Sequence, residues 1–269
     1  MQREVFDKYR GLIFKTSGIL LKENKQPLLI ARLGKRMRAL GIGDFGQYYQ
    51  RVVSDETGRE LGELVNAIST NVTNFFRENQ HFDFLARYAA EWAPKGAVKL
   101  RGWCAACSTG EEPYSIAFTL LENLPSEATF EIVASDISTK VLQIAKFGAY
   151  RDQDLAKFRG DLLKRYFQIG VDSAESFYRV KENVRSLISF RQINLSTPPF
   201  AVDGQLDFIF CRNVMIYFDQ HLKTRLLDQF HSLLKPDGLL FVGLSESLGG
   251  NTPEFINVQP SVYRKRSRK

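Results

Sequence analysis

Cysteine is scarce in this chain of 269 residues, and long apolar runs are absent. Cys104, Cys107 and Cys211 are too few and too unevenly spaced for a disulfide framework or a zinc site, so we expect buried thiols in a reducing compartment and no bound metal. No apolar run approaches the ~18 residues that a membrane-spanning helix needs. Residues 1–10 also lack the apolar core of a signal peptide. These absences predict a cytoplasmic protein that does not insert into membranes.

The chain also lacks both common phosphate-binding loops. The segment 105–115 (AACSTGEEPYS) joins a strand-like run, 98–104, to a helix-like run, 116–121. Such a corner is the ligand-binding position of a doubly wound α/β sheet, yet neither G-x-G-x-x-G nor G-x-x-x-x-G-K-[ST] is present. Its two carboxylates, Glu111 and Glu112, repel phosphate. They favour a cationic, phosphate-free nucleoside, and S-adenosylmethionine is the common ligand of that kind.

Polar residues follow two neighbouring strand-like runs. Asp136 ends the run 130–135, where an acidic side chain is suited to accept both ribose hydroxyls. Asn194 ends the run 188–193, and its amide is suited to an adenine edge. Taken alone, Asp136 has the alternative role of a helix N-cap.

The continuous apolar run 206–211 predicts a central strand that is buried on both faces. It brings Arg212 and Asn213 to the same carboxyl edge of the sheet. A later strand, 239–244, is expected after the turn signal at 235–238. Polar residues at four successive strand ends favour a ligand site over four unrelated structural roles.

Three segments carry a family resemblance: Asn71–Arg77 (NVTNFFR), Ser108–Ser115 (STGEEPYS) and Phe210–Phe218 (FCRNVMIYF). They look like the signature blocks of the chemotaxis receptor methyltransferases, the CheR family, and the similarity extends in order over nearly the whole chain. The resemblance implies a methyltransferase fold, S-adenosylmethionine as cofactor and S-adenosylhomocysteine as product. It also implies cofactor contacts from Asn71, Thr73, Arg77, Glu111, Asp136, Asn194, Leu195, Arg212 and Asn213.

Three parts are expected along the chain. Residues 1–70 form an all-helical N-terminal domain, and 71–95 link it to the sheet and carry the first cofactor block. Residues 96–269 form the α/β methyltransferase domain, interrupted at about 148–187 by two short strand-like runs among many charges. This interruption predicts an inserted antiparallel β-subdomain. In the family, such a subdomain can bind a short peptide at the receptor C-terminus.

Positive charge is concentrated at the N-terminal end. Residues 1–40 hold ten Lys and Arg against three acids, whereas residues 41–262 hold twenty-two against twenty-seven. A helix between Pro27 and Gly41 buries the stripe Leu29, Leu33, Met37 and Leu40 and presents Arg32, Lys35 and Arg38 on the opposite face. We expect this face to dock on acidic receptor helices. The alternative is a solvated helix face with no partner.

The expected reaction is methyl transfer to glutamate carboxylates of the cytoplasmic chemoreceptor helices, which adapts chemotactic signalling. A carboxylate with a pKa of about 4.3 is already ionised near pH 7, so no general base is required. The three histidines, His81, His221 and His231, are interpreted as surface or partly buried helix residues. Arg77 and Arg212 either neutralise the methionine carboxylate or orient the incoming one, and Tyr217 is a candidate to close over the methyl group.

Two other functions compete with this one. A nucleic-acid methyltransferase would suit the basic ends. Exocyclic amine methylation, however, usually employs an [N/D]-P-P-[Y/F/W] corner, and this chain has Arg212–Met215 there. Cytosine-C5 chemistry needs a Cys preceded by Pro, but Cys211 follows Phe210. A non-catalytic receptor-binding adaptor could lose the cofactor residues, which are intact here. We therefore expect no nucleic-acid partner.

Overall fold

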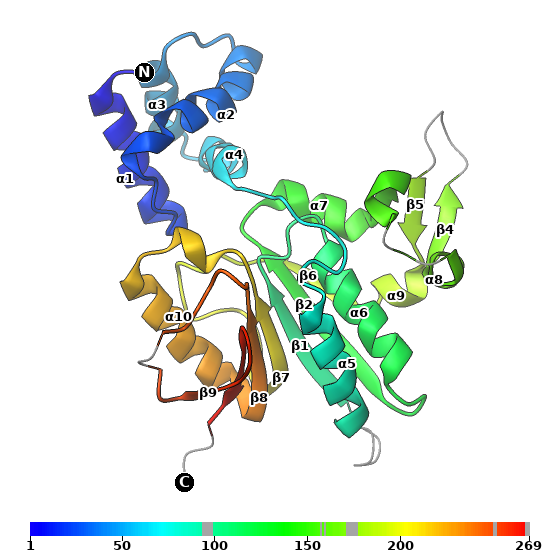
Figure 1. Cartoon of the computed structure of the whole chain (residues 1–269). Coiled ribbons are helices and arrows are strands. Elements are labelled where there is room, and N and C mark those ends of the chain that lie inside the picture. The colour runs from blue at the N-terminus through cyan, green and yellow to red at the C-terminus, as the bar shows by residue number, and fades with distance from the viewer. Residues whose placement is uncertain (93–98, 157, 159, 171–176, 250–251, 267–269) are drawn as a thin grey trace.

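The computed structural model describes residues 1–269 except 93–98, 157, 159, 171–176, 250–251 and 267–269. The N-terminal part is a bundle of four α-helices standing above an α/β body (Figure 1). Its elements are α1 (Arg3–Ser17), η1 (Glu23–Lys25), α2 (Gln26–Ala39), α3 (Phe45–Ser54) and α4 (Arg59–Ile68). The predicted stripe is confirmed, because Leu29, Leu33 and Met37 are buried in one core with residues of α1, α3 and α4.

The α/β body contains a seven-stranded sheet in the order β6-β2-β1-β7-β8-β10-β9. The first five strands of that order are parallel, and β10 pairs antiparallel with both β8 and β9. The strand bounds are β1 (Lys99–Ala105), β2 (Thr129–Asp136), β6 (Ile188–Gln192), β7 (Leu206–Cys211), β8 (Leu234–Val242), β9 (Phe255–Gln259) and β10 (Val262–Lys265). The predicted doubly wound methyltransferase fold is confirmed.

Two apolar cores cover the two faces of the sheet. One packs α5 (Gln80–Trp92) and α6 (Glu111–Asn123) on the sheet, and the other packs α10 (Gln220–Leu233). Successive residues of β1 alternate between them, since Cys104 belongs to the first core and Trp103 to the second. Gly102 is required by packing: a Cβ there would lie 2.1 Å from the Phe208 ring. Burial on both faces explains why β7 has no polar alternation.

One predicted boundary is wrong. The strand expected at 239–244 begins at Leu234, so the turn signal lies inside β8 as an irregularity rather than before it. Leu206 pairs with Leu234, but Phe208 pairs with Leu239, so extra residues of β8 bulge out between these pairs. Asp237 adopts a φ of 62° in the bulge.

The expected β-subdomain is present between α7 (Thr139–Phe147) and β6. It contains β3 (Ala149–Arg151), η3 (Asp152–Leu155), α8 (Gly160–Tyr166), β4 (Phe167–Gly170), β5 (Phe177–Val180) and α9 (Glu182–Arg185). Its three strands form an antiparallel sheet in the order β3-β5-β4. Part of the predicted insert, at 157, 159 and 171–176, lies outside the described residues.

The parallel strands β1, β2, β6 and β7 end at one edge of the sheet, and the connections that follow β1 and β7 carry the second and third signature blocks. Figure 1 shows the helical domain on this side of the sheet. Within the described part of the chain, no helix is both long and apolar enough to cross a membrane.

Candidate active site

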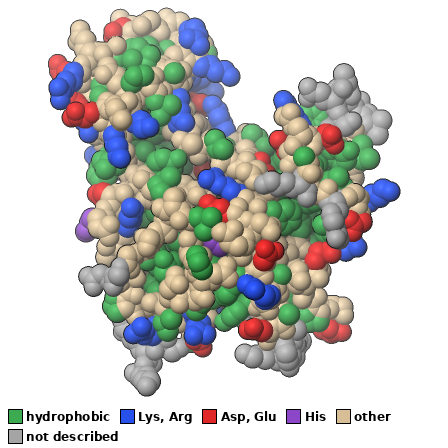
Figure 2. All heavy atoms as spheres, in the orientation of Figure 1, with side chains coloured by type: hydrophobic (Ala, Val, Ile, Leu, Met, Phe, Trp, Pro, Cys, Tyr) green, Lys and Arg blue, Asp and Glu red, His purple; other side chains and the backbone are tan. Residues whose placement is uncertain are grey.

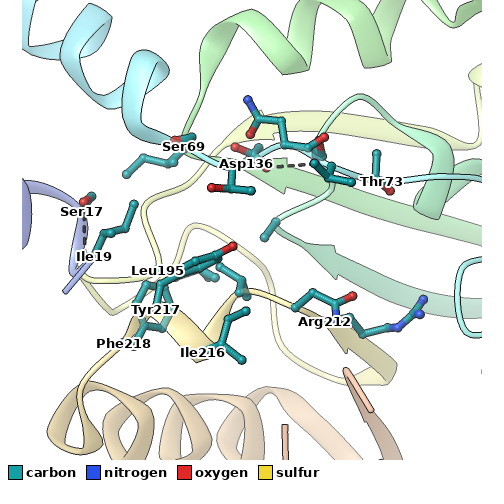
Figure 3. Close-up of a pocket in the computed structure, with 18 of the residues that line it drawn as sticks. Ser17, Ile19, Ser69, Thr73, Asp136, Leu195, Arg212, Ile216, Tyr217 and Phe218 are labelled. Carbon is teal, nitrogen blue, oxygen red and sulfur yellow. Dashed lines mark hydrogen bonds between the residues drawn. The ribbon is translucent and has the colours of Figure 1, made fainter. Parts of the chain in front are cut away.

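A cavity opens at the carboxyl edge of the sheet, between the segment 69–73 and the short helix η4 (Met215–Tyr217) (Figure 3). All but one of the nine residues implied for cofactor contact line it. They are Asn71, Thr73, Arg77, Asp136, Asn194, Leu195, Arg212 and Asn213, and Tyr217 lines the cavity as well. The exception is Glu111. The three signature blocks, separated by up to about 140 positions in sequence, therefore meet around one space.

Of the two adjacent glutamates, Glu112 rather than Glu111 lines the cavity. Both lie in the first turn of α6, where consecutive residues point about 100° apart, so only one of them faces the cavity. Glu111 accepts a 2.6 Å hydrogen bond from the Thr109 hydroxyl. Burial raises the pKa of Glu112, and Arg212 acts against that rise. The resemblance implied Glu111, and the structure places the neighbouring Glu112 at the cavity instead.

Asp136 ends β2 with its carboxylate buried and fixed. One oxygen accepts from the Ser108 amide at 3.0 Å, and the other accepts from the Ser138 amide at 2.9 Å. Burial raises the pKa of Asp136, and these amides oppose the rise. Asp136 is not the N-cap of the following helix, because Ser138 caps α7 through Val141. Each carboxylate oxygen keeps a lone pair for a ligand hydroxyl.

Asn194 lines the cavity, but its side chain is committed to protein partners. Its Nδ2 donates to the Thr16 carbonyl at 2.6 Å, and its Oδ1 accepts from the amide and hydroxyl of Ser196. One N–H of Nδ2 is not used by these bonds, so an adenine contact from this amide stays a prediction. The nearby lining residues Ile193 and Leu195 are apolar and buried, which suits a flat base without the amide.

Arg212 is the centre of a buried ion-pair network. Its side chain is fully buried, donating to Glu112 at 2.9 Å, to Glu78 at 3.1 Å and to the Arg77 carbonyl. Although burial acts to raise the pKa of Glu78, Arg212 and the donors Asn213 and Leu244 lower it overall. Arg212 therefore forms a strand-end salt bridge at the wall of the cavity.

Glu246 organises the loop that carries the third block. Its carboxylate accepts from three main-chain amides, those of Asn213 (2.6 Å), Gly243 (2.7 Å) and Ile216 (3.2 Å). Asn213 is held there with a φ of 57°. The lining residues Ala106 and Ser108 also have positive φ, and backbone strain of this kind clusters at functional sites. No sequence motif indicates Glu246 or Glu78, because their partners Asn213, Ile216 and Arg212 lie 30 or more positions away along the chain.

Two interpretations based on helical faces need correction. His81 is fully buried rather than a surface or partly buried residue, and burial beside Arg212 lowers its pKa to about 4. Arg32 does not share an exposed face with Lys35 and Arg38. It folds back to donate to the carbonyls of Ile68 and Ser69 and to the Thr70 hydroxyl, because α2 packs beside the end of α4.

Comparisons with known proteins agree with this geometry. The family model "CheR methyltransferase, SAM binding domain" matches residues 71–264, and "CheR methyltransferase, all-alpha domain" matches residues 4–69. The chain is 45% identical to chemotaxis protein methyltransferase 2 of Pseudomonas aeruginosa, over 97% of this chain and 92% of that protein. It is 42% identical to the chemotaxis protein methyltransferase of Escherichia coli, over 96% and 89%.

The Salmonella typhimurium chemotaxis protein methyltransferase is 41% identical, over 96% of this chain and 88% of that protein. Among solved structures, the glycopeptide N-methyltransferase MtfA complexed with sinefungin aligns with a TM-score of 0.34 and 18% identity, over 58% of this chain and 48% of that chain. The two family models and the relatives matched over most of their length show which family this is. The chain belongs to the CheR methyltransferase family.

Proposed function

We propose that the cavity binds S-adenosylmethionine, and that the protein transfers its methyl group to glutamate side chains of chemoreceptors. The products are glutamate methyl esters and S-adenosylhomocysteine. The observation that carries the proposal is the buried Asp136 carboxylate, fixed by two main-chain amides in a cavity lined by all but one of the implied cofactor residues.

The lining residues fit the proposed cofactor. The remaining lone pairs of Asp136 suit the two ribose hydroxyls, and the apolar wall at Ile137, Ile193 and Leu195 suits adenine. Glu112, at the corner that has no phosphate-binding loop, suits the cationic end of the methionine group. We therefore assign to Glu112 the role that the family resemblance implied for Glu111.

Bound S-adenosylmethionine supplies an electrophilic methyl group on a sulfonium. The acceptor carboxylate is ionised near neutral pH, so the protein has to align the reactants and exclude water rather than remove a proton. His81 is suited to no proton transfer here, since it is buried behind Arg212 and its pKa is lowered to about 4.

The two arginines have different roles in this proposal. Arg212 is a positioning residue, because its two amino groups, Nη1 and Nη2, donate to Glu112, Glu78 and the Arg77 carbonyl. The Arg77 side chain is partly exposed at the cavity, with one bond to the Val72 carbonyl, so it is the cation available to a carboxylate. Tyr217 approaches the cavity from η4 and is suited to cover the methyl group (Figure 3).

Receptor docking is proposed for two surfaces. Lys35 and Arg38 are exposed on α2, and a basic helix face steers acidic receptor helices. Figure 2 shows Lys and Arg side chains on the helical domain beside the notch that separates it from the β-subdomain. The β-subdomain is the proposed site for a receptor C-terminal peptide. Both contacts imply action in the cytoplasm, where the helical region of chemoreceptors lies.

Label transfer tests the reaction. Purified protein with methyl-tritiated S-adenosylmethionine should label chemoreceptor cytoplasmic fragments and leave RNA and buffer controls unlabelled. The label should be released as methanol by mild alkali, because a carboxyl methyl ester is alkali-labile. Alkali-stable label on the receptor would indicate N-methylation, and label on RNA alone would favour the nucleic-acid alternative.

A further inference from the structure

The end of α1 leaves the helical bundle and contacts the α/β body beside the cavity. Two hydrogen bonds hold it there, one on each side of Gly18. The Thr16 carbonyl accepts from Asn194 at 2.6 Å, and the Leu20 amide donates to the Tyr217 carbonyl at 2.8 Å. The segment Thr16–Leu20, which we name the α1 latch, thus joins the loop after β6 to the short helix η4.

Gly18 allows the latch to lie this close. It ends α1 in the left-handed region, with a φ of 71°, and its amide donates to the Phe14 carbonyl at 2.9 Å. A Cβ at this position would lie 2.5 Å from Cδ2 of Leu222 and 3.0 Å from Cβ of Ser196. Both neighbours belong to the α/β body, so a side chain at position 18 requires Leu222 or the latch to shift.

The latch also forms part of the cavity wall. Ser17 and Ile19, the neighbours of Gly18, both line the cavity, as do Tyr217 and Phe218 on the other side of the contact. Figure 3 shows Ser17 and Ile19 at one end of the cavity and Arg212 at the other. The methyltransferase body without the helical domain would therefore lack this end of the wall.

We propose that the α1 latch is a positioning element of the cofactor site, and that Asn194 and Gly18 act through it. The inference rests on the proposed function, in which this cavity holds S-adenosylmethionine. Cofactor binding and docking of the helical domain on the α/β body are then thermodynamically coupled. Because such coupling is reciprocal, whatever loosens the latch lowers cofactor affinity, and bound cofactor tightens the latch.

The test uses two matched glycine variants of the full chain. Gly18→Ala adds a Cβ against Leu222, whereas Gly41→Ala adds one at a similar φ of 67° with nothing within 4 Å. Both substitutions place an alanine in the left-handed region at nearly the same φ, so a difference between them reports the contact. By calorimetry with S-adenosylhomocysteine, Gly18→Ala should bind at least about fivefold more weakly than wild type, and Gly41→Ala within about twofold. Leu222→Val, which removes both δ-methyl groups, should restore part of the loss in a Gly18→Ala background.

Asn194→Asp gives a second test from the other side of the same contact. The aspartate keeps an acceptor for Ser196 but has no donor for the Thr16 carbonyl, so cofactor affinity should fall. In a double-mutant cycle, Asn194→Asp should cost little further affinity once Gly18→Ala has displaced the latch. Fully additive losses would mean that Asn194 contacts the cofactor directly, which overturns its positioning role.

Equal affinities for wild type and Gly18→Ala would overturn the latch proposal. A wild type that binds no S-adenosylhomocysteine would instead count against the proposed function. The latch contact would still be measurable in that case, as non-additive losses of thermal stability for Gly18→Ala and Asn194→Asp without ligand. Additive losses of thermal stability would show that Gly18 and Asn194 do not act through one shared contact.

Discussion

The Nη1 of Arg212 donates to Oε2 of Glu112 across 2.9 Å at the wall of the cavity, with the arginine side chain fully buried. Glu78 accepts a hydrogen bond from the second amino group, Nη2. One guanidinium therefore pairs with two carboxylates whose charged forms burial disfavours. The pairing has two consequences. It opposes the rise that burial causes in the pKa of Glu112, next to a proposed cationic ligand, and it ties α6 to the strand end of β7.

Removal of this cation should destabilise the fold more at neutral than at acidic pH. Arg212→Met leaves two largely buried carboxylates unpaired, and breaking a buried ion pair typically costs about 3–5 kcal/mol. The pKa of each carboxyl in the variant rises above its unfolded value. The unfolding free energy of the variant is therefore closest to that of wild type below the pKa that these carboxyls have in the unfolded chain. The difference in unfolding free energy grows as the pH rises from there through their pKa in the folded variant.

Urea unfolding at pH 5 and pH 7 measures that deficit. Arg165→Met is the matched control, because it breaks an exposed pair with Glu122 that should contribute less than about 1 kcal/mol. Adding Glu112→Gln to Arg212→Met should recover part of the loss. A deficit for Arg212→Met no larger than the control's would show that the buried pair contributes nothing special.

Asp136→Asn should weaken S-adenosylhomocysteine binding at least about tenfold. The variant removes the charge that strengthens hydrogen bonds to ribose, each worth roughly 1.5–3 kcal/mol. It also sets an amide N–H₂ against the amides of Ser108 or Ser138. Calorimetry measures the affinity, with Glu131→Gln on the outer part of the same strand as the control. Unchanged affinity in a folded variant would remove Asp136 from the site.

His81 should make the protein less stable as the pH falls. Its pKa is lowered to about 4 from 6.5, chiefly by burial and then by the Arg212 charge, while Glu78 and the Pro260 carbonyl act in the opposite direction. The unfolded chain thus binds a proton between about pH 6.5 and pH 4 that the folded chain does not. Stability contributed by the neutral ring is present above that window and lost on acidification, by an amount of order 3 kcal/mol.

Unfolding series from pH 7 to pH 4.5 test this prediction. His81→Leu should show a shallower loss of unfolding free energy with falling pH than wild type, whatever its stability at pH 7. His221→Leu, at an exposed position of α10, should keep the wild-type slope. Parallel curves for wild type and His81→Leu would show that His81 does not titrate in this range.

Much of the site was predictable because it depends on strand ends. A buried apolar run such as 206–211 marks a strand, its last residue marks the edge, and Arg212 and Asn213 follow directly. The choice between Glu111 and Glu112 depends on the rotational phase of α6 by one residue, which a pattern of adjacent acids does not specify. No local signal indicates that Ser17 reaches the cavity, because the packing of one domain on another decides it.

The same limit explains Arg32. Helical spacing put it on a face with Lys35 and Arg38, but its guanidinium partners, Ile68 and Ser69, lie 36 and 37 positions away. A helical wheel describes one helix and contains no information about the end of another. The basic face of α2 therefore divides into a structural residue and two exposed ones.

That division gives the last prediction. Lys35→Glu with Arg38→Glu should leave S-adenosylhomocysteine affinity unchanged but slow receptor methylation severalfold at low salt. The difference in rate from wild type should narrow as salt rises, because exposed charges are screened beyond about 8–10 Å near physiological ionic strength.

Arg32→Met should affect the fold and the cofactor site rather than receptor docking. It releases the carbonyls of Ile68 and Ser69 that lead into Asn71, so it should lower thermal stability and cofactor affinity with no added salt dependence. Initial rates at about 20 and 300 mM salt, together with calorimetry, separate the two variants. If the double charge reversal methylates receptor at the wild-type rate at low salt, α2 is only solvated surface, and docking belongs to another face, with the β-subdomain the next to test.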